Sequence, residues 1–513
     1  MTLATTENTD TKSTQQPITS DGPLRETYDP LDFVVSDDLL QHLFMQDHLD
    51  RFRFNRAQDC WFVYEQGLWA PDMRSAVPDC LTIWLRKYLE AIISEYGPPL
   101  NGEGKLTKEH FKLAMRYSSG AGQKAILNMG STQAIPQLLQ SEFDKDKHLL
   151  NTPTCVVDLK SGDQLLHDPL RFMTRRTTVG PSRRETPLFD SFLRDITMND
   201  ESVAGFLQTF LGYCLTGETS AHKVLFLWGS GGNGKSALLA LLREIMGTYA
   251  KTADGQILMS GAETRHLTEL ADLAGARAVV ISELPSDAMW SAQRLMSLTG
   301  GDTLSARFMR RDLFEYLPQF TLIMASNRRP AVQNPNPAFL RRMLLLRFKF
   351  APAKPDNNLL EKLREEHDGI LQWMIDGAVR YYEKGLLIPT SISEATLDYA
   401  ADEDDIGQWL ESRTVKVPKS FVANSTIFPS YQTWADENGG RAYRKRAISE
   451  RLRQLGFEPG KHQGQRGYFG LKLITEAEQA WQQSPRFPDK CGNNTSEPDV
   501  AGAQTRQDHP TVQ

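Results

Sequence analysis

The sequence predicts an α/β fold in which a parallel β-sheet is covered by helices. Between residues 191 and 350, helical patterns alternate with the apolar runs KVLFLW, ARAVVIS and FTLIMAS. Short runs that are apolar on both faces are typical of strands in a parallel sheet packed between helices. The chain has an ordinary globular composition, with 513 residues of which 40% are hydrophobic and 24% charged. This length allows about three domains.

Residues 26–150 are expected to form a mixed but mainly helical N-terminal domain. The segment CWFVYEQGLWAPD predicts a hairpin of aromatic and β-branched strands around a glycine turn. The next segment, AVPDCLTIWLRKYLEAIISEYG, has apolar residues at near-helical spacing and ends in Gly97, which predicts a helix. Residues 1–25 and 483–513 bury too little apolar surface to offset the entropy of ordering, so both are expected to be disordered tails.

Residues 151–190 are expected to form a second hairpin and a linker. The segment TCVVDLKSGDQLLHDP has two apolar stretches around the turn KSGD, which predicts the hairpin. The α/β domain is then placed at residues 191–352, and a helical lid at residues 353–400.

Residues 401–482 predict a winged-helix domain. In YRKRAISERLRQLGF the apolar residues share one helical face, and the basic hairpin KHQGQRGYFGLKLI follows. A helix followed by a hairpin is the order of winged-helix domains, which place a basic helix in a DNA groove. We therefore expect DNA contacts from Arg444, Lys445 and Arg446. The alternative is a charged face that is only solvated.

The overall charge and the cysteines exclude several classes of protein. A net charge of −6 gives no overall basic field, so any contact with nucleic acid must come from local patches. The five cysteines lack the spacing of a zinc site and are expected to be reduced thiols. There is no apolar signal segment and no run of about 18 apolar residues. We expect a soluble, cytoplasmic protein with no membrane partner.

The segment GSGGNGKS places four glycines in six positions, directly after KVLFLW and before the helical pattern SALLALLREIM. It fits the pattern GxxxxGK[ST], in which backbone N–H groups at a helix N-terminus cradle phosphates. We expect Lys235, on an exposed loop, to reach the β and γ phosphates of ATP and Ser236 to bind Mg²⁺. A purely structural glycine loop is the alternative. The expected ATP-binding residues are Gly229, Ser230, Gly231, Gly232, Asn233, Gly234, Lys235 and Ser236.

Two polar residues follow the next predicted strands. Glu283 comes after AVVIS, where a carboxylate can hold Mg²⁺ through water or polarise the attacking water. Asn327 comes after FTLIMAS, where its amide can orient that water. The alternatives are a solvated strand end for Glu283 and an ordinary turn residue for Asn327.

Two clusters of arginines suit phosphate groups. AFLRRMLLLRFKF offers a planar guanidinium before another strand, which in ring ATPases acts on the neighbouring subunit's site. Arg342 is the preferred candidate and Arg341 the alternate. In LTGGDTLSARFMRRDLFEYLPQF, the cations Arg307, Arg310 and Arg311 flank an aromatic residue, as suits a single-stranded DNA track. In both clusters the alternative is a solvated basic surface.

Taken in order, these strand ends resemble a superfamily 3 helicase, an AAA+ type motor. More closely, residues 40–475 resemble the phage and plasmid primase-helicases related to the poxvirus one. The motifs that carry this resemblance are RFRFNRAQDCWFVYEQGLWAPD, VVDLKSGDQLLHDP, FLQTFLGYCLTGE, GSGGNGKS, SLTGGDTLSAR, MASNRRP, EEHDGILQWMIDGA and ATLDYAADEDDIGQWL. The resemblance implies a hexameric ring, ATP at subunit interfaces and translocation on single-stranded DNA by pore hairpins, typically 3′ to 5′.

The chain departs from this family at two places. Met296 stands where the family usually has Lys, and Thr154-Cys155 where it usually has Asn-Gly. Members that make primers fuse a further polymerase module upstream, so we do not expect this chain to synthesise primers alone.

The sequence therefore predicts an ATP-dependent DNA helicase for phage, prophage or plasmid replication in bacterial cytoplasm. Its expected partners are single-stranded and forked DNA, further copies of itself in a hexamer, and a primase or replication-initiation protein. The alternatives are an origin-binding initiator that ATP switches without processive unwinding, and a primase-helicase with priming activity.

Overall fold

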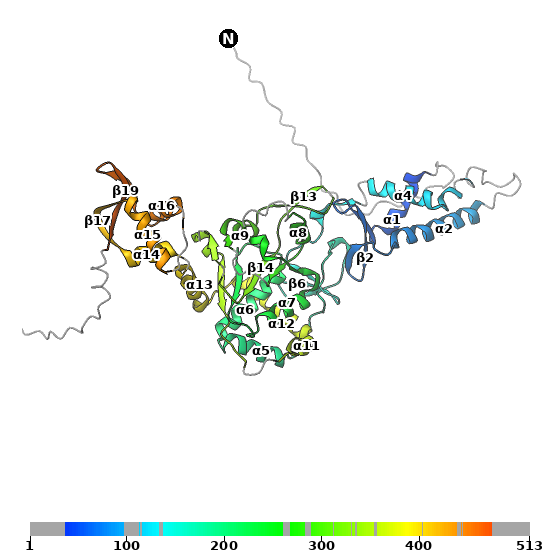
Figure 1. Cartoon of the computed structure of the whole chain (residues 1–513). Coiled ribbons are helices and arrows are strands. Elements are labelled where there is room, and N and C mark those ends of the chain that lie inside the picture. The colour runs from blue at the N-terminus through cyan, green and yellow to red at the C-terminus, as the bar shows by residue number, and fades with distance from the viewer. Residues whose placement is uncertain are drawn as a thin grey trace, which may run out of the picture. The chain divides into compact units, whose positions relative to one another are not determined.

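The computed structural model of the chain describes residues 36–96, 112, 115–132, 137–259, 267–282, 289–310, 312–329, 331–333, 336–352, 356–402, 404–438, 443 and 445–474. They belong to two compact units, residues 1–397 and 398–513 (Figure 1). The tails expected at residues 1–25 and 483–513 lie outside the described residues. Across the described part, no helix combines the length and apolarity needed to span a bilayer.

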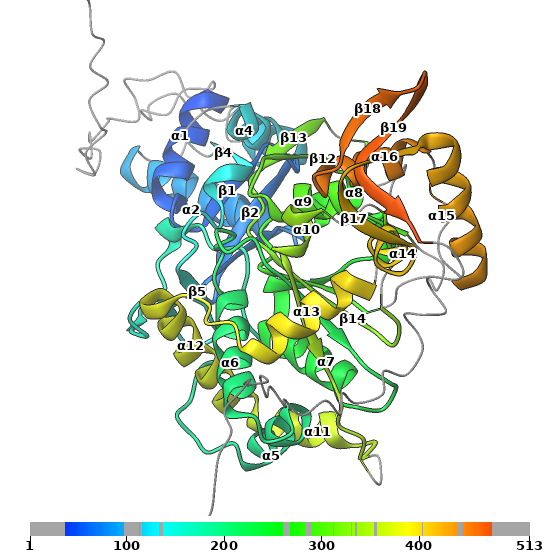
Figure 2. The ribbon, with the colours of Figure 1, turned by 90° about the vertical axis from the view of Figure 1, so that its left-hand side faces the viewer.

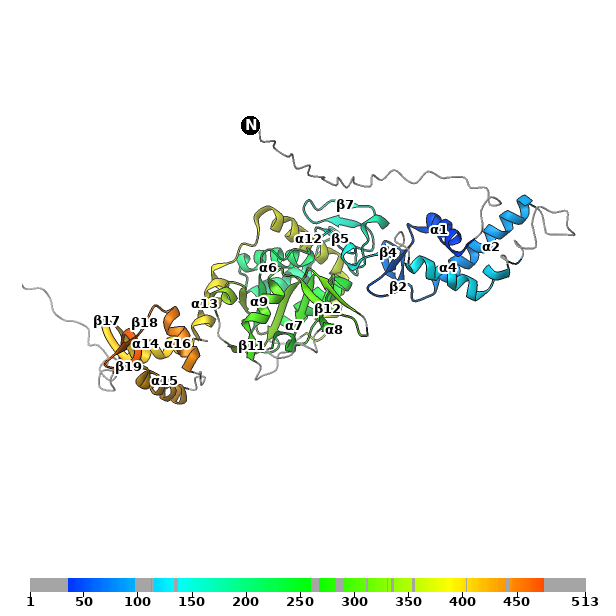
Figure 3. The same ribbon diagram turned by 90° about the horizontal axis from the view of Figure 1, so that it is seen from above.

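The N-terminal part of the first unit combines helices with a four-stranded sheet of order β3-β2-β1-β4. The predicted hairpin is confirmed, because β2 and β3 pair antiparallel around the turn Gln66-Gly67, where both residues have positive φ. The predicted helix is confirmed as α2, whose first two N–H groups donate to the Asp72 carboxylate. Figure 2 and Figure 3 show α1, α2 and α4 lying together beside this sheet. The bounds are α1 Asp37–His48, β1 Phe52–Asn55, β2 Cys60–Glu65, β3 Leu68–Pro71, α2 Ala76–Tyr96, α4 Gly120–Thr132 and β4 Gln137–Leu138.

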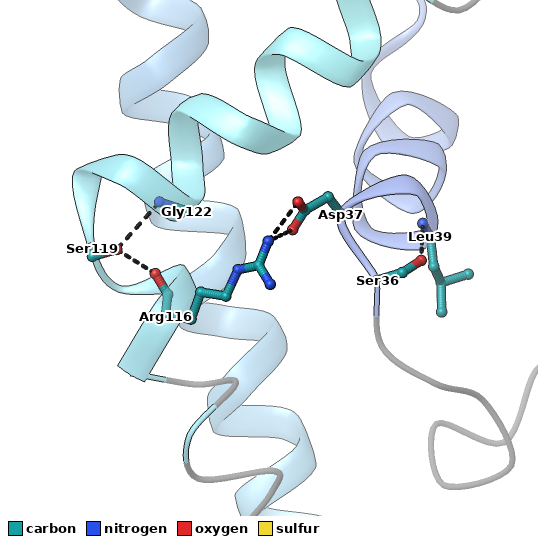
Figure 4. Close-up of polar contacts among 6 residues, drawn as sticks. All are labelled: Ser36, Asp37, Leu39, Arg116, Ser119 and Gly122. Carbon is teal, nitrogen blue, oxygen red and sulfur yellow. Dashed lines mark hydrogen bonds and ion pairs between the residues drawn. The ribbon is translucent and has the colours of Figure 1, made fainter.

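Polar contacts fix the start of α1 (Figure 4). Ser36 caps the helix, since its Oγ accepts a hydrogen bond of 3.1 Å from the N–H of Leu39. Arg116 donates to both carboxylate oxygens of Asp37, at 2.7 and 3.0 Å, and the Oγ of Ser119 donates to the carbonyl oxygen of Arg116. Because Arg116 is exposed, this pair sets the orientation of α1 against the segment leading into α4 more than it adds stability.

A small antiparallel sheet joins the N-terminal part to the α/β part. The predicted second hairpin is confirmed by the pairing of β6 with β7. The amide Nδ2 of Asn151 donates to the carbonyl oxygen of Gly67 at 2.9 Å, and the fully buried Arg277 donates to those of Leu149 and Leu215, each at 2.7 Å. The linker is therefore bonded to both of its neighbours. Its strands are β5 Leu149–Asn151, β6 Val156–Asp158 and β7 Gln164–Leu165.

The α/β part is built on a five-stranded parallel sheet of order β16-β8-β14-β10-β9. This confirms the predicted α/β class and each apolar run that was predicted to be a strand. Successive side chains alternate between the two faces, and both faces are buried: Leu225 and Leu227 lie in one core, while Val224 and Phe226 are buried on the other side. The strands are β8 Val224–Trp228, β9 Ala250–Thr252, β10 Ala278–Ile281, β14 Thr321–Ser326 and β16 Met343–Arg347.

Helices cover this sheet, and residues of α5, α6, α7 and α12 share a core with one of its faces. The helix predicted after the glycine-rich segment is confirmed as α7, which stops at Gly247. At the β16 edge, the N–H of Leu345 donates to the hydroxyl of Thr396 in α13 at 3.1 Å. The bounds are α5 Pro187–Thr197, α6 Glu201–Leu215, α7 Lys235–Met246, α11 Leu359–Leu363, α12 His367–Lys384 and α13 Thr390–Asp402.

A β-hairpin, β12 with β13, interrupts the α/β part before β14 and packs on α8. Leu304 and Ala306 are buried, whereas the alternate residues of β12 are exposed. The Tyr316 hydroxyl donates to the carbonyl oxygen of Leu270 at 2.6 Å, which fixes the base of the hairpin. The bounds are α8 Leu267–Asp272, β11 Met289–Ser291, α9 Ala292–Thr299, β12 Leu304–Arg307, β13 Leu313–Tyr316, β15 Ala331–Gln333 and α10 Pro337–Leu340.

The second unit is a small α/β domain with its own core. Its elements follow the order helix, strand, helix, helix, strand, strand, and its antiparallel sheet has the order β17-β19-β18. Trp409, Tyr431 and Leu452 are fully buried in the core, and the Tyr468 hydroxyl donates to the carbonyl oxygen of Ser449 at 3.1 Å. This bond ties the hairpin to α16. The bounds are α14 Asp405–Arg413, β17 Thr414–Ala423, α15 Asn424–Asn438, α16 Lys445–Gln454, β18 Glu458–His462 and β19 Gln465–Leu473.

Candidate nucleotide-binding site

The glycine-rich loop lies at the carboxyl end of β8, between Trp228 and α7. Its glycines have distinct roles. Gly234 has a φ of +91°, and a Cβ there would lie 2.8 Å from the Cγ2 of Ile196; a Cβ at Gly229 would lie 2.3 Å from the carbonyl oxygen of Phe348. Gly231 would meet nothing within 4 Å. The loop is therefore packed tightly against its support and open on its other side.

The N-terminus of α7 opens into a cavity. Its N-cap is Gly234, which has no side chain to accept a hydrogen bond, and the first helical residues Lys235, Ser236 and Ala237 line the cavity. The first N–H groups of a helix have no partner inside the helix, and the helix dipole gives this end a positive partial charge. The arrangement fits the phosphate groups of a nucleotide.

Lys235 is not the exposed residue that the sequence suggested, because its side chain is buried at 5% exposure. Its Nζ donates to the carbonyl oxygens of Gly229 and Ser230 and to the Oδ1 of Asn233, at 2.8, 2.9 and 2.8 Å. Burial lowers the pKa of this ammonium from its usual value. Asn233 is held in turn, since its Nδ2 donates to the carbonyl oxygen of Phe348 at 3.1 Å. The loop thus closes around its own lysine, and an entering phosphate must compete with these oxygens.

Asn327 lies in the same cavity as the loop. The strand that it follows, β14, is the neighbour of β8, with Ser326 paired to Trp228, so the two strand ends meet at one edge of the sheet. Glu283 lies outside the described residues. The strand before it, β10, ends at Ile281 beside β14.

The cavity has a volume of about 560 Å³, within the usual range for small-molecule sites. Besides the loop and Asn327, its described lining comes from α5, from the segment between β16 and α11, and from the start of α11. These residues were not predicted from the sequence, although PLFDSFLRDIT shows the i, i+3, i+4, i+7 spacing of a helix face. They are Leu188, Ser191, Phe192, Asp195, Phe350, Pro352, Asp356, Asn357, Leu359 and Leu360.

Arg341 and Arg342 lie at the opposite edge of the sheet. The carbonyl oxygen of Arg342 accepts from the N–H of Val224 at 2.8 Å, and that of Arg341 accepts from the Nζ of Lys223 at 2.5 Å. Both arginines therefore precede the amino ends of β8 and β16, whereas the cavity lies beyond the carboxyl ends. The length of β8 separates these edges by about 13 Å. One chain does not bring its arginine pair to its own loop.

The ring of Trp228 lies close to two arginines, a contact that was not predicted from the sequence. The guanidinium of Arg329 lies 4.2 Å from the centre of the Trp228 ring, and that of Arg347 lies 4.9 Å from it. All three residues belong to the carboxyl edge of adjacent strands. Their contacts hold the loop's entry residue in place.

The first group of candidate DNA-binding residues lies on the β12–β13 hairpin. Arg307 and Arg310 are exposed, and the Phe308 ring stacks on that of Phe314 with centroids 5.1 Å apart. Arg311 lies outside the described residues. The tip thus presents cations beside aromatic rings, as the sequence predicted.

The second group lies at the start of α16 in the second unit. Lys445 and Arg446 are exposed; the Nε of Arg446 donates to Glu450 at 3.0 Å, and the Nζ of Lys445 lies 5.6 Å from the centre of the Phe428 ring. Arg444 lies outside the described residues. These exposed contacts are weak enough to yield to a phosphate.

Comparison with known proteins gives two family matches. Residues 41–198 match the family described as "D5 N terminal like", and residues 227–342 match a "Family of unknown function (DUF5906)". Among solved structures, the chain is similar to the "apo structure of NrS-1 C terminal region", with a TM-score of 0.47 and 11% identity over 86% of this chain and 100% of that one.

Three similar viral proteins are each named "Putative helicase". The one from Acanthamoeba polyphaga mimivirus is 24% identical over 59% of this chain and 34% of its own length. The one from Frog virus 3 is 24% identical over 47% and 27%, and the one from Invertebrate iridescent virus 6 is 26% identical over 50% and 28%. The chain therefore spans about a third or less of these relatives. Over separate parts of its length, the chain is therefore similar to the "D5 N terminal like" family and to viral proteins named as helicases.

Proposed function

We propose that the chain is an ATP-driven DNA helicase of superfamily 3 that acts in phage or plasmid replication. One observation carries this proposal: a single cavity at the carboxyl edge of the parallel sheet contains both the glycine-rich loop and Asn327. Ligands of open α/β sheets bind at this edge. The sheet order, in which β8 lies between two strands that come later in the chain, supports an AAA+ type motor.

The proposed site assigns a task to each residue. The N–H groups of residues 229–236 bind the triphosphate of ATP, and Lys235 turns from the loop oxygens to the β and γ phosphates. Ser236 and Glu283 would hold Mg²⁺, which supplies positive charge to the phosphates when bound. Asn327 orients the water that attacks the γ phosphate.

The position of Arg342 supports a shared site in a ring. An arginine at the amino edge of one sheet can serve the cavity of an adjoining subunit, where it would stabilise charge that develops on the transferring phosphoryl group. We propose a hexamer with ATP at each interface and with the β12–β13 hairpins contacting single-stranded DNA.

A forked-duplex assay tests the helicase activity. With ATP and Mg²⁺ the protein should displace the labelled strand, and with a non-hydrolysable ATP analogue it should bind the fork without displacing it. Displacement must stop when ATP is replaced, because the motor needs the energy of hydrolysis. Binding that never leads to displacement with ATP would instead favour the initiator described next.

A second candidate function is an initiator that ATP switches on a specific DNA site. The second unit favours it, because its order of elements is that of a winged helix and its hairpin is basic. In this hairpin, Lys461 lies directly opposite Arg466. Like charges in facing positions destabilise a strand pair, so an anionic partner such as DNA is the expected compensation.

The contribution of this hairpin can be measured by salt titration. Replacing both Lys461 and Arg466 by Ala should lower duplex affinity and reduce the slope of log K against log salt by about 1.8, since each phosphate contact contributes about 0.9. Arg413→Ala is the control, because Arg413 is already paired with Glu437 at 2.5 Å. An unchanged slope in the double variant would show that the hairpin does not contact phosphates.

A further inference from the structure

The cavity at the loop has a second wall that the phosphates do not need. Four of its lining residues, Leu188, Ser191, Phe192 and Asp195, belong to α5 and repeat at helical spacing, so one face of α5 looks into the cavity. The segment after β16 and the start of α11 add further apolar residues, of which Phe350 is aromatic. Apolar side chains do not favour binding of a charged triphosphate, whereas they do favour binding of the base and the sugar of a nucleotide.

The two sides of this wall are bonded to each other. Glu366, which follows α11 and is 7% exposed, accepts hydrogen bonds from the N–H groups of Leu188 and Phe189 at the start of α5, at 3.0 and 2.8 Å. A carboxylate at a helix N-terminus is a stabilising cap. The Phe192 ring also lies against the loop, 3.1 Å from where a Cβ of Gly234 would be. The wall is thus a fixed part of the nucleotide cavity.

The wall carries two carboxylates, which differ in their partners. Asp356 accepts from the Nζ of Lys362 at 2.7 Å and from the N–H of Asn358 at 3.0 Å. Asp195 is an exposed residue of α5, and its carboxylate makes no hydrogen bond or ion pair with any residue that the structure describes. A carboxylate repels phosphate and accepts hydrogen bonds without donating any, so Asp195 suits a group that carries N–H.

We propose that this wall holds the base and that Asp195 selects adenine by accepting a hydrogen bond from its 6-amino group. In this proposal the adenine ring stacks on the side chain of Phe350, as bases stack on aromatic side chains. When position 6 of the base is held at Asp195, guanine and hypoxanthine place an oxygen against the carboxylate, which repels it, whereas their N–H groups at positions 1 and 2 point elsewhere. This inference deepens the proposed function and rests on it, since it concerns the base of the same nucleotide.

The test compares nucleotides that differ at position 6. Equilibrium binding of ATP, purine riboside triphosphate, ITP and GTP is measured with Mg²⁺ on the full chain and on Asp195→Asn. The unaltered chain should bind ATP about tenfold or more tightly than the other three, as expected for a hydrogen bond to a charged group. In Asp195→Asn the preference for ATP over ITP should fall close to one, because an amide can also donate to the 6-oxygen.

Asp190→Asn is the matched control, since Asp190 is an exposed acid on the same helix and does not line the cavity. It should keep the preference of the unaltered chain. Equal affinity of the unaltered chain for ATP and ITP, or an unchanged preference in Asp195→Asn, would overturn the inference while leaving the proposed motor intact. Absence of binding to any of the four nucleotides would overturn the proposed function as well. The comparison on the unaltered chain needs no variant, so misfolding of Asp195→Asn does not prevent a decision.

Discussion

Lys235→Ala is expected to lower ATP hydrolysis by about 100- to 1,000-fold or more, the usual effect of removing one group that stabilises charge in the transition state. The same substitution should also affect folding stability, because the Lys235 ammonium donates hydrogen bonds to three oxygens of the loop. Its loss should cost about 1 kcal/mol of folding stability, since the freed oxygens face a cavity that water can enter.

The measurement is steady-state hydrolysis together with thermal unfolding of the same preparations. Lys384→Ala is the control, an exposed lysine in the last turn of α12, and it should retain both properties. Hydrolysis that persists in a folded Lys235→Ala protein would show that this loop is not the catalytic one.

Arg342→Ala is expected to lower hydrolysis by about 1,000-fold or more while ATP binding persists, as for an arginine that acts from the neighbouring subunit. Within one chain Arg342 does not contact the cavity, since the two lie at opposite edges of the sheet. Arg341→Ala shows which member of the pair has this role.

Mixing two inactive variants distinguishes a shared site from a site within one chain. A ring that contains both Lys235→Ala and Arg342→Ala subunits has some interfaces where an intact loop meets an intact arginine. Such rings should recover part of the activity, whereas neither variant recovers it alone. No recovery in rings shown to be mixed would contradict the shared site.

Much of the fold can be predicted from the sequence because its strands and turns are indicated by residues that are adjacent in the chain. The strands β8, β10, β14 and β16 are apolar on both faces, and Gly232 and Gly234 have a positive φ, a local backbone conformation that glycine adopts without strain. These features could be predicted without any tertiary contact. The same holds for the β2–β3 and β6–β7 hairpins, whose turns have a clear residue signature.

The remaining parts of the site depend on contacts between distant segments. Asp195 and Phe350 are far apart in sequence and meet only in the cavity, so neither gave a signal. The burial of Lys235 was missed because the oxygens that surround its ammonium come from the folded loop itself. The placement of Glu283 stays a prediction, as do the roles of the arginines.

The strand β8 has the loop after its last residue and Arg342 bonded at its first. In the proposed ring, each subunit thus binds ATP with the loop at the carboxyl end of β8. At the amino end of the same strand, it supplies Arg342 to the ATP site of a neighbouring subunit. If β8 tilts when ATP is cleaved at its carboxyl end, Arg342 at its amino end would move by a comparable distance at the adjacent interface. The rigid strand would then set the order in which neighbouring subunits hydrolyse ATP, and no flexible segment would be needed to couple their sites.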